Sequence, residues 1–471
     1  MKTKFNWDKV DGLAKALGGR VELIGKLLDK DGYTPEMIDL IKNSEFRKDF
    51  IHLYGFHIDS NESDPMEAVT YLEDAVGMAP AHMNYASGKF DYGDWENAFF
   101  MPRPCMLKYD GTVDYYLDPN DYGKKEDGTA SDVADFAYGG NAMMEWGRDG
   151  KKIWYKIVPD EDDNTSASIY FSDQKLDDGF HAWSFINNQG NLVDHFYTPI
   201  YNGTIDSNGK LRSISDKTNT ELCQNKTAAE EIEAAELNNP GEDKLWYTEV
   251  FADITLINLL LVLISKCLDT QAAFGDGHSR AESGYMTTTL IGTGTLNDKG
   301  LFYGSNDEIT SVKVFGMENY WANIARRFAG LVSADTSEEK VSTFKYKFTY
   351  GTEDGSEAEQ YNTTGETYID SGINIDLYNI TPSYIANNGA IQKYAFIAAG
   401  AMFLSGMQDN STGRKTYYCD WGSVTPGINY PIRGGRAGNS FYCGSFALFL
   451  SVKETAAAWE VGASLSCKPL S

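Results

Sequence analysis

The feature that most constrains this chain is a nearly all-apolar segment near its middle. Residues 254–264 read Ile-Thr-Leu-Ile-Asn-Leu-Leu-Leu-Val-Leu-Ile, where only Thr255 and Asn258 interrupt the hydrocarbon side chains. A helix that is apolar on every side has to be buried, and this one is too short to cross a bilayer. We therefore expect a buried helix that begins at Asp253 as N-cap residue and ends near Leu268.

The chain after residue 50 otherwise consists of short segments rich in Tyr, Phe, Trp and Ile, separated by Asp-Gly, Asn-Gly and Asp-Pro. This pattern is typical of strands joined by tight turns. Residues 106–117 predict a hairpin that turns at Asp110-Gly111. Residues 153–158 and 195–201 predict further strands, and the polar stretch 216–243 predicts a surface excursion with a little helix.

Charge is distributed unevenly along the 471 residues. The net charge is −27, yet residues 1–50 contain ten Lys and Arg against nine Asp and Glu. Apolar residues recur there at intervals of three and four residues, and this spacing predicts short amphipathic helices. Their apolar stripe can pack on the body or dock to another copy or a larger assembly. The acidity of the remainder would repel nucleic acid and anionic lipid, so we expect neither as a partner.

Several classes of site find no support in the sequence. The six cysteines are far apart and have no zinc spacing, so we expect free thiols. The acidic turns around Asp118 and Asp160 do not match a calcium loop, and Gly292-Thr-Gly294 lacks the third glycine of a dinucleotide loop. We expect no metal and no cofactor. Residues 1–20 lack the apolar core of a signal peptide, so we expect synthesis in a cytoplasm and no membrane insertion.

Four motifs follow the apolar segment in order: Val314-Phe-Gly-Met-Glu-Asn-Tyr-Trp-Ala-Asn-Ile324, Pro431-Ile-Arg-Gly-Gly-Arg436, Gly444-Ser-Phe-Ala-Leu-Phe-Leu450 and Gly462-Ala-Ser-Leu-Ser466. Their succession resembles the C-type-lectin-like fold in its formylglycine-generating-enzyme branch. Within that branch the chain resembles the variable proteins of diversity-generating retroelements, including phage tropism determinants. Upstream, residues 54–59 and 116–120 are similar to segments of gut-phage tail proteins.

The charge and strand patterns, together with this resemblance, imply an α+β chain with three parts. These are a short α-helical N-terminal module over residues 1–50, a β-rich middle domain over 51–179, and a C-type-lectin-like domain over 180–471. The third part would carry a variable ligand-binding region at 417–445. In the same family the segment around Glu318 and Trp321 braces the binding face, and we expect Arg326 and Arg327 to pair with some of the excess carboxylates.

The region 417–445 has the composition of a binding surface. Tyr, Phe and Trp supply rigid contact area, while Ser, Asn and Gly adapt their hydrogen bonds. Residues 436–445 also lack Trp, Met, Lys, Glu and Gln, the five types that adenine-directed diversification cannot produce if the retroelement resemblance holds. The expected ligand contacts are Tyr417, Tyr418, Asp420, Trp421, Ser423, Asn429, Arg436, Asn439, Ser440, Phe441, Tyr442 and Ser445.

We interpret the chain as a phage receptor-binding protein on the virion, in the tail or at the particle surface. It would bind a protein or glycan receptor on the bacterial host, form a homotrimer as tropism determinants do, and contact other virion proteins through residues 1–50. One alternative is a structural capsid or tail decoration protein. Another is an enzyme of the formylglycine-generating type, which needs two cysteines after the Gly-Gly turn, where this chain has only Cys443. We expect no catalysis.

Overall fold

The computed structural model describes residues 51–187, 189–280, 289–335, 344–348, 375–380, 388–398, 400–408, 416–425 and 427–470. The helical module expected over residues 1–50 lies outside these ranges. The described part is β-rich with few helices, as the sequence predicts. None of its helices has the length and apolar character needed to cross a membrane.

The first sheet is antiparallel and has the strand order β2-β1-β10-β9. Its strands are β1 (Leu53–Ile58), β2 (Val69–Glu73), β9 (Trp154–Pro159) and β10 (Ala167–Ser172). Burial alternates along β10, where Ile169 and Phe171 point into the core and Tyr170 is half-buried. β9 confirms the strand expected over 153–158.

The second sheet has seven strands in the order β14-β28-β11-β8-β5-β6-β7. They are β5 (Arg103–Lys108), β6 (Val113–Asp118), β7 (Asp121–Lys125), β8 (Gly140–Trp146), β11 (Phe196–Pro199), β14 (Trp246–Thr248) and β28 (Leu465–Cys467). β5 and β6 confirm the hairpin expected over 106–117. The Asp110 carboxylate accepts the Thr112 amide at 2.9 Å, and Gly111 has φ +80°, a value that glycine adopts without strain.

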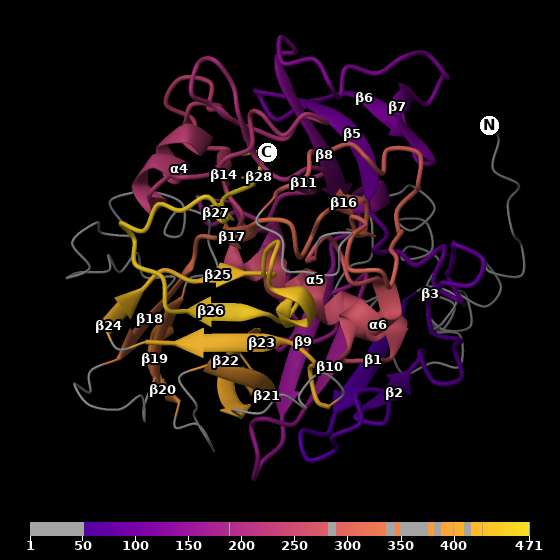
Figure 1. Ribbon diagram of the computed structural model, residues 1–471. Helices are drawn as coiled ribbons and strands as arrows, with labels where there is room; N and C mark the ends of the chain where they lie inside the picture. Colours follow the sequence, from indigo (N-terminus) through magenta and orange to yellow (C-terminus); the bar gives the residue numbers. More distant parts are fainter. Residues whose placement is uncertain are drawn as a thin grey trace, which may run out of the picture.

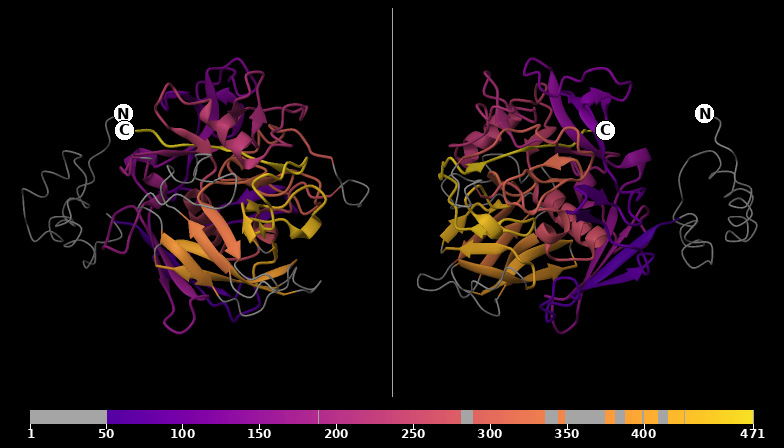
Figure 2. Two further views of the ribbon diagram at one scale, coloured as in Figure 1. Left: turned by 90° about the vertical axis from the view of Figure 1, so that its left-hand side faces the viewer. Right: turned by 45° about the vertical axis from the view of Figure 1, so that its right-hand side comes forward.

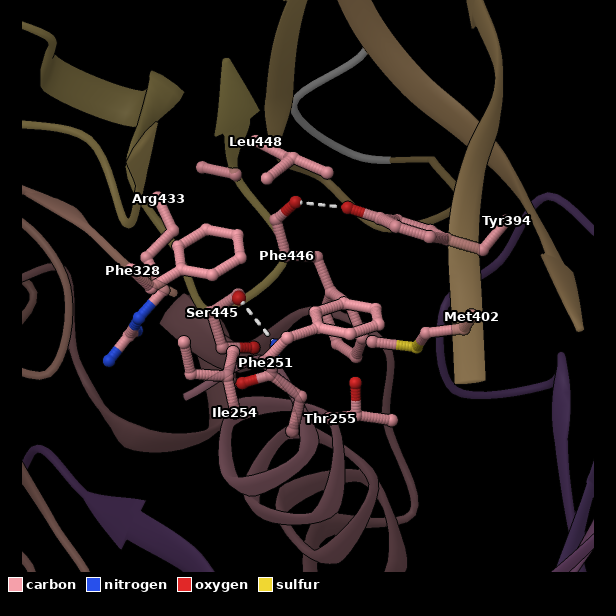
Figure 3. Close-up of a pocket in the computed structure, with 12 residues that line it drawn as sticks. Phe251, Ile254, Thr255, Phe328, Tyr394, Met402, Arg433, Ser445, Phe446 and Leu448 are labelled. Carbon is pink, nitrogen blue, oxygen red and sulfur yellow. Dashed lines mark hydrogen bonds between the residues drawn. The ribbon is translucent and has the colours of Figure 1, made fainter. Parts of the chain in front are cut away.

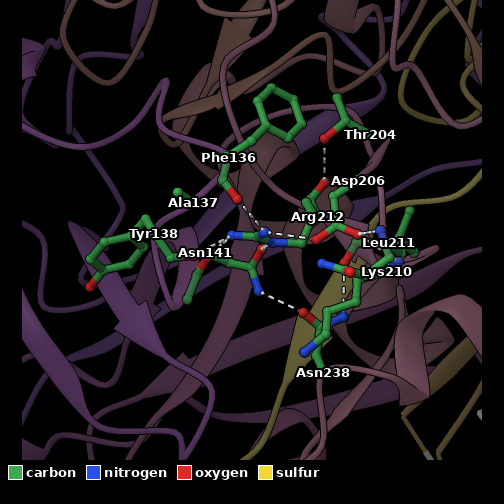
Figure 4. Close-up of polar contacts among 12 residues, drawn as sticks. Phe136, Ala137, Tyr138, Asn141, Thr204, Asp206, Lys210, Leu211, Arg212 and Asn238 are labelled. Carbon is green, nitrogen blue, oxygen red and sulfur yellow. Dashed lines mark hydrogen bonds and ion pairs between the residues drawn. The ribbon is translucent and has the colours of Figure 1, made fainter.

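This second sheet joins the two domains expected over 51–179 and 180–471. β8 pairs with β5 on one side and with β11 on the other, and β28 extends the same sheet from the end of the chain. Arg212 adds a second link, because its buried guanidinium donates to the carbonyl oxygens of Phe136, Tyr138 and Gly140 and to the side chain of Asn141 (Figure 4). The second sheet therefore crosses the expected boundary at 179/180, and the two parts are not separate domains.

The apolar segment forms helix α5 (Phe251–Ser265), and all fifteen of its residues are buried. It lies at the centre of the molecule, with the C-terminal strands on one side and the first sheet on the other (Figures 1 and 2). Tyr71 of β2 donates its hydroxyl to the carbonyl oxygen of Leu263 at 2.8 Å. The helix ends at Lys266, which has a left-handed φ of 53°.

The start of α5 differs from the expectation. Val250 is the N-cap residue, and Asp253 lies inside the first turn. The Asp253 carboxylate instead binds the ammonium group of Lys468 at 3.0 Å, and both side chains are buried. The cap expected at Asp253 was wrong because this carboxylate neutralises a lysine 215 residues away.

The C-terminal half contains two more sheets. One has the order β22-β21-β23-β26-β25-β17-β27, and the other β20-β19-β18-β24. Their strands are β17 (Ala325–Arg327), β18 (Leu331–Asp335), β19 (Phe344–Phe348), β20 (Ile375–Ile380), β21 (Asn388–Ile397), β22 (Ala401–Gln408), β23 (Trp421–Val424), β24 (Gly427–Asn429), β25 (Ile432–Arg433), β26 (Leu448–Leu450) and β27 (Val461–Gly462). The first of these sheets covers α5, and the rings of Phe251 and Phe403 stack across this boundary at 6.0 Å.

The remaining described elements are short. Helix α4 (Ala228–Glu236) confirms the small helix expected within 216–243 and begins with a capping box formed by Thr227 and Glu230. Helix α6 (Thr270–Phe274) follows α5. The others are the pairs β3 (His82–Asn84) with β4 (Lys89–Asp91), β12 (Thr204–Ile205) with β13 (Leu211–Arg212) and β15 (Lys313–Val314) with β16 (Met317–Glu318), and the 3-10 turns η2 (Arg148–Gly150), η3 (Trp183–Phe185) and η5 (Ser440–Tyr442).

Candidate binding face

The Gly-Gly motif forms the turn that the sequence predicts. Gly434 and Gly435 directly follow β25 and have φ values of +81° and +72°. A Cβ atom on Gly435 would lie 2.7 Å from the sulfur of Cys443, and one on Gly434 would lie 3.2 Å from the Cα of Trp321. Glycine is therefore required both by the backbone conformation and by close packing.

A buried ionic network fixes the start of this turn. The Glu249 carboxylate accepts from the Arg433 guanidinium at 2.7 Å and lies 3.3 Å from that of Arg326. Both arginines also donate to the carbonyl oxygen of Tyr320, at 3.0 Å and 2.6 Å. Burial and the nearby Arg433 lower the pKa of Arg326 to about 10, so it keeps its charge at neutral pH. The pairing expected of Arg326 with a carboxylate is thus confirmed.

The same network continues to helix α5 and to the end of the candidate region. The Tyr320 hydroxyl donates to the side-chain oxygen of Asn258 at 3.0 Å. The Asn258 amide in turn donates to the carbonyl oxygen of Ser445 at 2.8 Å. One of the two polar residues in the apolar helix therefore holds the chain where residues 436–445 end. Arg327, the neighbour of Arg326 in the sequence, donates to the buried carboxylate of Glu231 in α4 at 2.8 Å. Its expected pairing with a carboxylate is thus confirmed as well.

Five of the twelve expected contact residues are buried. Their exposed fractions do not exceed 5%, so their side chains cannot meet a ligand at the surface. These residues are Tyr418, Asp420, Asn429, Ser440 and Ser445.

Each of the five is buried for a structural reason. Tyr418 packs edge-on against Tyr394 and Phe446. Asp420 accepts the amide of Phe446 at 2.7 Å, and burial raises its pKa well above the ordinary value for a carboxyl group. The hydroxyl of Ser440 donates to Glu308 at 2.7 Å, and the amide of Asn429 donates to the Thr425 carbonyl at 2.9 Å. Ser445 is held through its backbone, as described above.

The half-buried residues form two groups. Trp421 of β23 and Tyr442 of η5 lie together, with ring centroids 4.2 Å apart and planes inclined by 46°. Ser423 lies two residues farther along β23, and its hydroxyl is 2.7 Å from that of Ser451. We call Trp421, Tyr442 and Ser423 the aromatic face.

The second half-buried group lies at the turn after the Gly-Gly motif. Arg436 pairs with Glu460 at 3.4 Å, and its amide donates to the side chain of Asn439 at 3.0 Å. Tyr417 is half-buried near the start of the region, where its amide donates to the Ser63 carbonyl at 2.7 Å. Phe441 belongs to η5, but its side chain lies outside the described part.

Cys443 bears on the enzyme alternative. Its sulfur lies 3.4 Å from the carbonyl oxygen of Arg436, and burial raises the pKa of its thiol well above the ordinary value. All six cysteines are free and buried. Among the described side chains, no three His, Cys, Asp or Glu residues converge as a metal ion would require.

The glycine pair at Gly292 and Gly294 has a local role. The backbone amides of Gly294 and Leu296 donate to the buried carboxylate of Glu318 at 3.1 and 3.2 Å, and the Thr295 hydroxyl donates at 2.9 Å. Such a loop of amides would suit an anion. Here the anion is the protein's own glutamate, which also lies beside buried Lys313.

Comparison with known proteins adds no family to this description. No protein-family model matches the chain, and no curated protein is significantly similar to it. The arrangement of its own residues therefore carries the functional argument.

Sequence reasoning missed residues that flank the aromatic face. Asn388 of β21 is exposed and accepts a hydrogen bond from the Trp421 indole. Phe449 of β26 is half-buried beside Ser423 in the neighbouring strand. Both residues lie outside the aromatic-rich run 417–445, and only strand pairing brings them to the aromatic face.

Proposed function

We propose that this chain is a virion receptor-binding protein of a bacteriophage, with a C-type-lectin-like domain that displays the aromatic face to the host cell. The observation that carries the proposal is the half-exposed Trp421–Tyr442 pair, held above a braced core. Tyrosine and tryptophan are the residues that dominate binding surfaces, because they bury much area and lose little conformational entropy. Seven of the twelve expected contacts thus remain candidates, and five act as support.

The scaffold supports this proposal through two anchors. Glu249 binds Arg433 directly before the Gly-Gly turn, and Asn258 holds the carbonyl oxygen of Ser445, so residues 436–445 begin and end at fixed points. A preorganised surface loses less entropy on binding than a flexible one.

The wider parts of the proposal follow from the family resemblance. The protein would be a homotrimer, would attach to other virion proteins through residues 1–50, and would be diversified by a retroelement within residues 436–445, with Trp421 as a fixed contact. Repetition on a particle would raise a modest single-site affinity through avidity.

Binding of the purified full chain to cells of candidate host bacteria tests the proposal. The test variant combines Trp421→Ala with Tyr442→Ala. The matched control combines Trp154→Ala with Tyr170→Ala, which removes a half-buried tryptophan and tyrosine from the first sheet instead. We expect wild type and control to bind, and the test variant to lose at least tenfold in affinity at unchanged melting temperature. If wild type binds no host yet assembles onto particles, the chain is a decoration protein.

A further inference from the structure

Two rows of side chains cross the C-terminal sheet on the side where Trp421 lies. Residues paired directly across neighbouring strands share a face of the sheet. One row joins Gln408, Ala390 and Trp421 across β22, β21 and β23. The other joins Asn388, Ser423 and Phe449 across β21, β23 and β26. The aromatic face is therefore part of a surface that spans four strands.

Apart from the buried methyl group of Ala390, the side chains of the two rows are aromatic, amide or hydroxyl groups. Asn388 and Gln408 are exposed, and Gln408 accepts a hydrogen bond from the amide of Gln392. None of the described side chains in the two rows is charged. The net charge of the chain is −27, so these two rows stand out because a charged ligand would find no side chain of opposite charge in them.

We infer that this surface binds an uncharged saccharide, an inference that rests on the proposed function and names its ligand class. A sugar ring presents C–H groups on one face and hydroxyl groups at its edge. The C–H face can stack on the Trp421 and Tyr442 rings, whose π faces carry negative charge. The amides of Asn388 and Gln408 each offer donors and an acceptor to the hydroxyl groups. An anionic glycan would gain no charged contact from the described side chains of the two rows.

The experiment measures binding of the full chain to an array of neutral and sialylated oligosaccharides. Variants are Trp421→Ala, Asn388→Ala and the first-sheet control Trp154→Ala. We expect binding to at least one neutral oligosaccharide with no preference for sialylated forms. The affinity for that oligosaccharide should fall at least tenfold in Trp421→Ala, at least threefold in Asn388→Ala, and less than twofold in the control.

The same variants on host cells separate this inference from the proposed function. Cell binding that is lost after periodate treatment of the cells supports a saccharide. Cell binding that is lost after protease treatment, with no array signal, overturns the saccharide and leaves receptor binding intact. Failure of the wild-type chain on both cells and array overturns both.

A second inference concerns a cavity between α5 and the C-terminal sheet (Figure 3). Its volume is about 30 Å³, and most of its lining is apolar, including Met402 and Leu448. Two hydroxyl groups of lining residues, those of Thr255 and Ser445, have no hydrogen-bond partner among the described residues. Both side chains are at most 2% exposed.

We propose that this cavity binds ordered water. A buried polar group without a partner destabilises the fold, and two such groups around one space are the setting in which internal water is found. A cavity of this size has room for one or two water molecules. Water there would link Thr255 of α5 to Ser445, where the loop that carries Tyr442 ends.

High-resolution crystal structures of wild type, Thr255→Val and Thr255→Ser test the water site. Valine keeps the shape of threonine without its hydroxyl, and serine keeps the hydroxyl without the methyl group. We expect electron density within hydrogen-bond distance of Thr255 and Ser445 in wild type and Thr255→Ser, weakened in Thr255→Val, which should also melt at a lower temperature. A dry cavity that admits xenon in wild type, together with a higher melting temperature of Thr255→Val, would overturn the proposal.

Discussion

Replacing Glu249 by glutamine tests whether the ionic network holds the candidate face in place. The carboxylate is 4% exposed and is the anion shared by the guanidinium groups of Arg433 and Arg326, at 2.7 and 3.3 Å. Glutamine has the same shape but no charge, so two buried cations would lose their counterion. Breaking a buried ion pair by removing one partner costs about 3–5 kcal/mol.

An exposed ion pair supplies the comparison. Arg103 and Glu126 approach within 2.6 Å, but their side chains are 38% and 47% exposed. Such pairs contribute about 0–1 kcal/mol. Glu126→Gln should therefore change the free energy of unfolding by less than about 1 kcal/mol, although its ion pair is the shorter of the two.

Urea denaturation followed by intrinsic tryptophan fluorescence measures both variants. We expect Glu249→Gln to shift the unfolding midpoint several times farther than Glu126→Gln. A second readout is host-cell binding under conditions where Glu249→Gln is still folded, which should fall because the turn at Gly434-Gly435 loses its anchor. Equal midpoints for the two variants would refute the reasoning that burial makes this network strong.

Three further predictions concern local stability. Gly435→Ala should destabilise at least twice as much as Gly128→Ala in denaturant titrations: both have left-handed φ values, but only the first places a Cβ atom against Cys443, at 2.7 Å. Burial raises the pKa of Glu231 from 4.5 to about 6. The stabilisation that comes from protonated Glu231 is therefore complete below pH 4.5, and it falls by about 2 kcal/mol as the pH rises through 6. Glu231→Gln should abolish this pH dependence in unfolding curves measured between pH 4.5 and 7. Thr227→Ala should lower the free energy of unfolding by about 1 kcal/mol because it removes the capping box of α4. An unchanged midpoint in urea would contradict this.

Local signals explain which elements could be predicted from the sequence. The hairpin at Asp110-Gly111 is encoded by four adjacent residues, and the burial of α5 follows from its composition alone. The strands at 154–159 and 196–199 carry dense aromatic and branched side chains. In each case the residues that determine the structure are neighbours in the chain.

Long-range partners explain what could not be predicted. Asp253 lies in the first turn of α5, and its carboxylate binds Lys468 instead of capping the helix. No local sequence pattern reveals this distant partner. The composition of residues 417–445 indicates a binding surface but cannot separate its two sides. Tyr418 and Trp421 are both aromatic, yet Tyr394 and Phe446 bury the first, and the second remains half-exposed. The domain boundary at 179/180 failed to separate structural units for the same reason, since β8 and β11 pair across it.

The measurement that tests the account most directly is competition for the host surface. Purified full-length chain is added to host cells before phage particles, and particle adsorption is counted. The account predicts that wild type reduces adsorption in a dose-dependent way and that the Trp421→Ala/Tyr442→Ala variant, folded and in the same oligomeric state, does not. Equal competition by both proteins, or none by wild type, would contradict a receptor-binding role for the aromatic face.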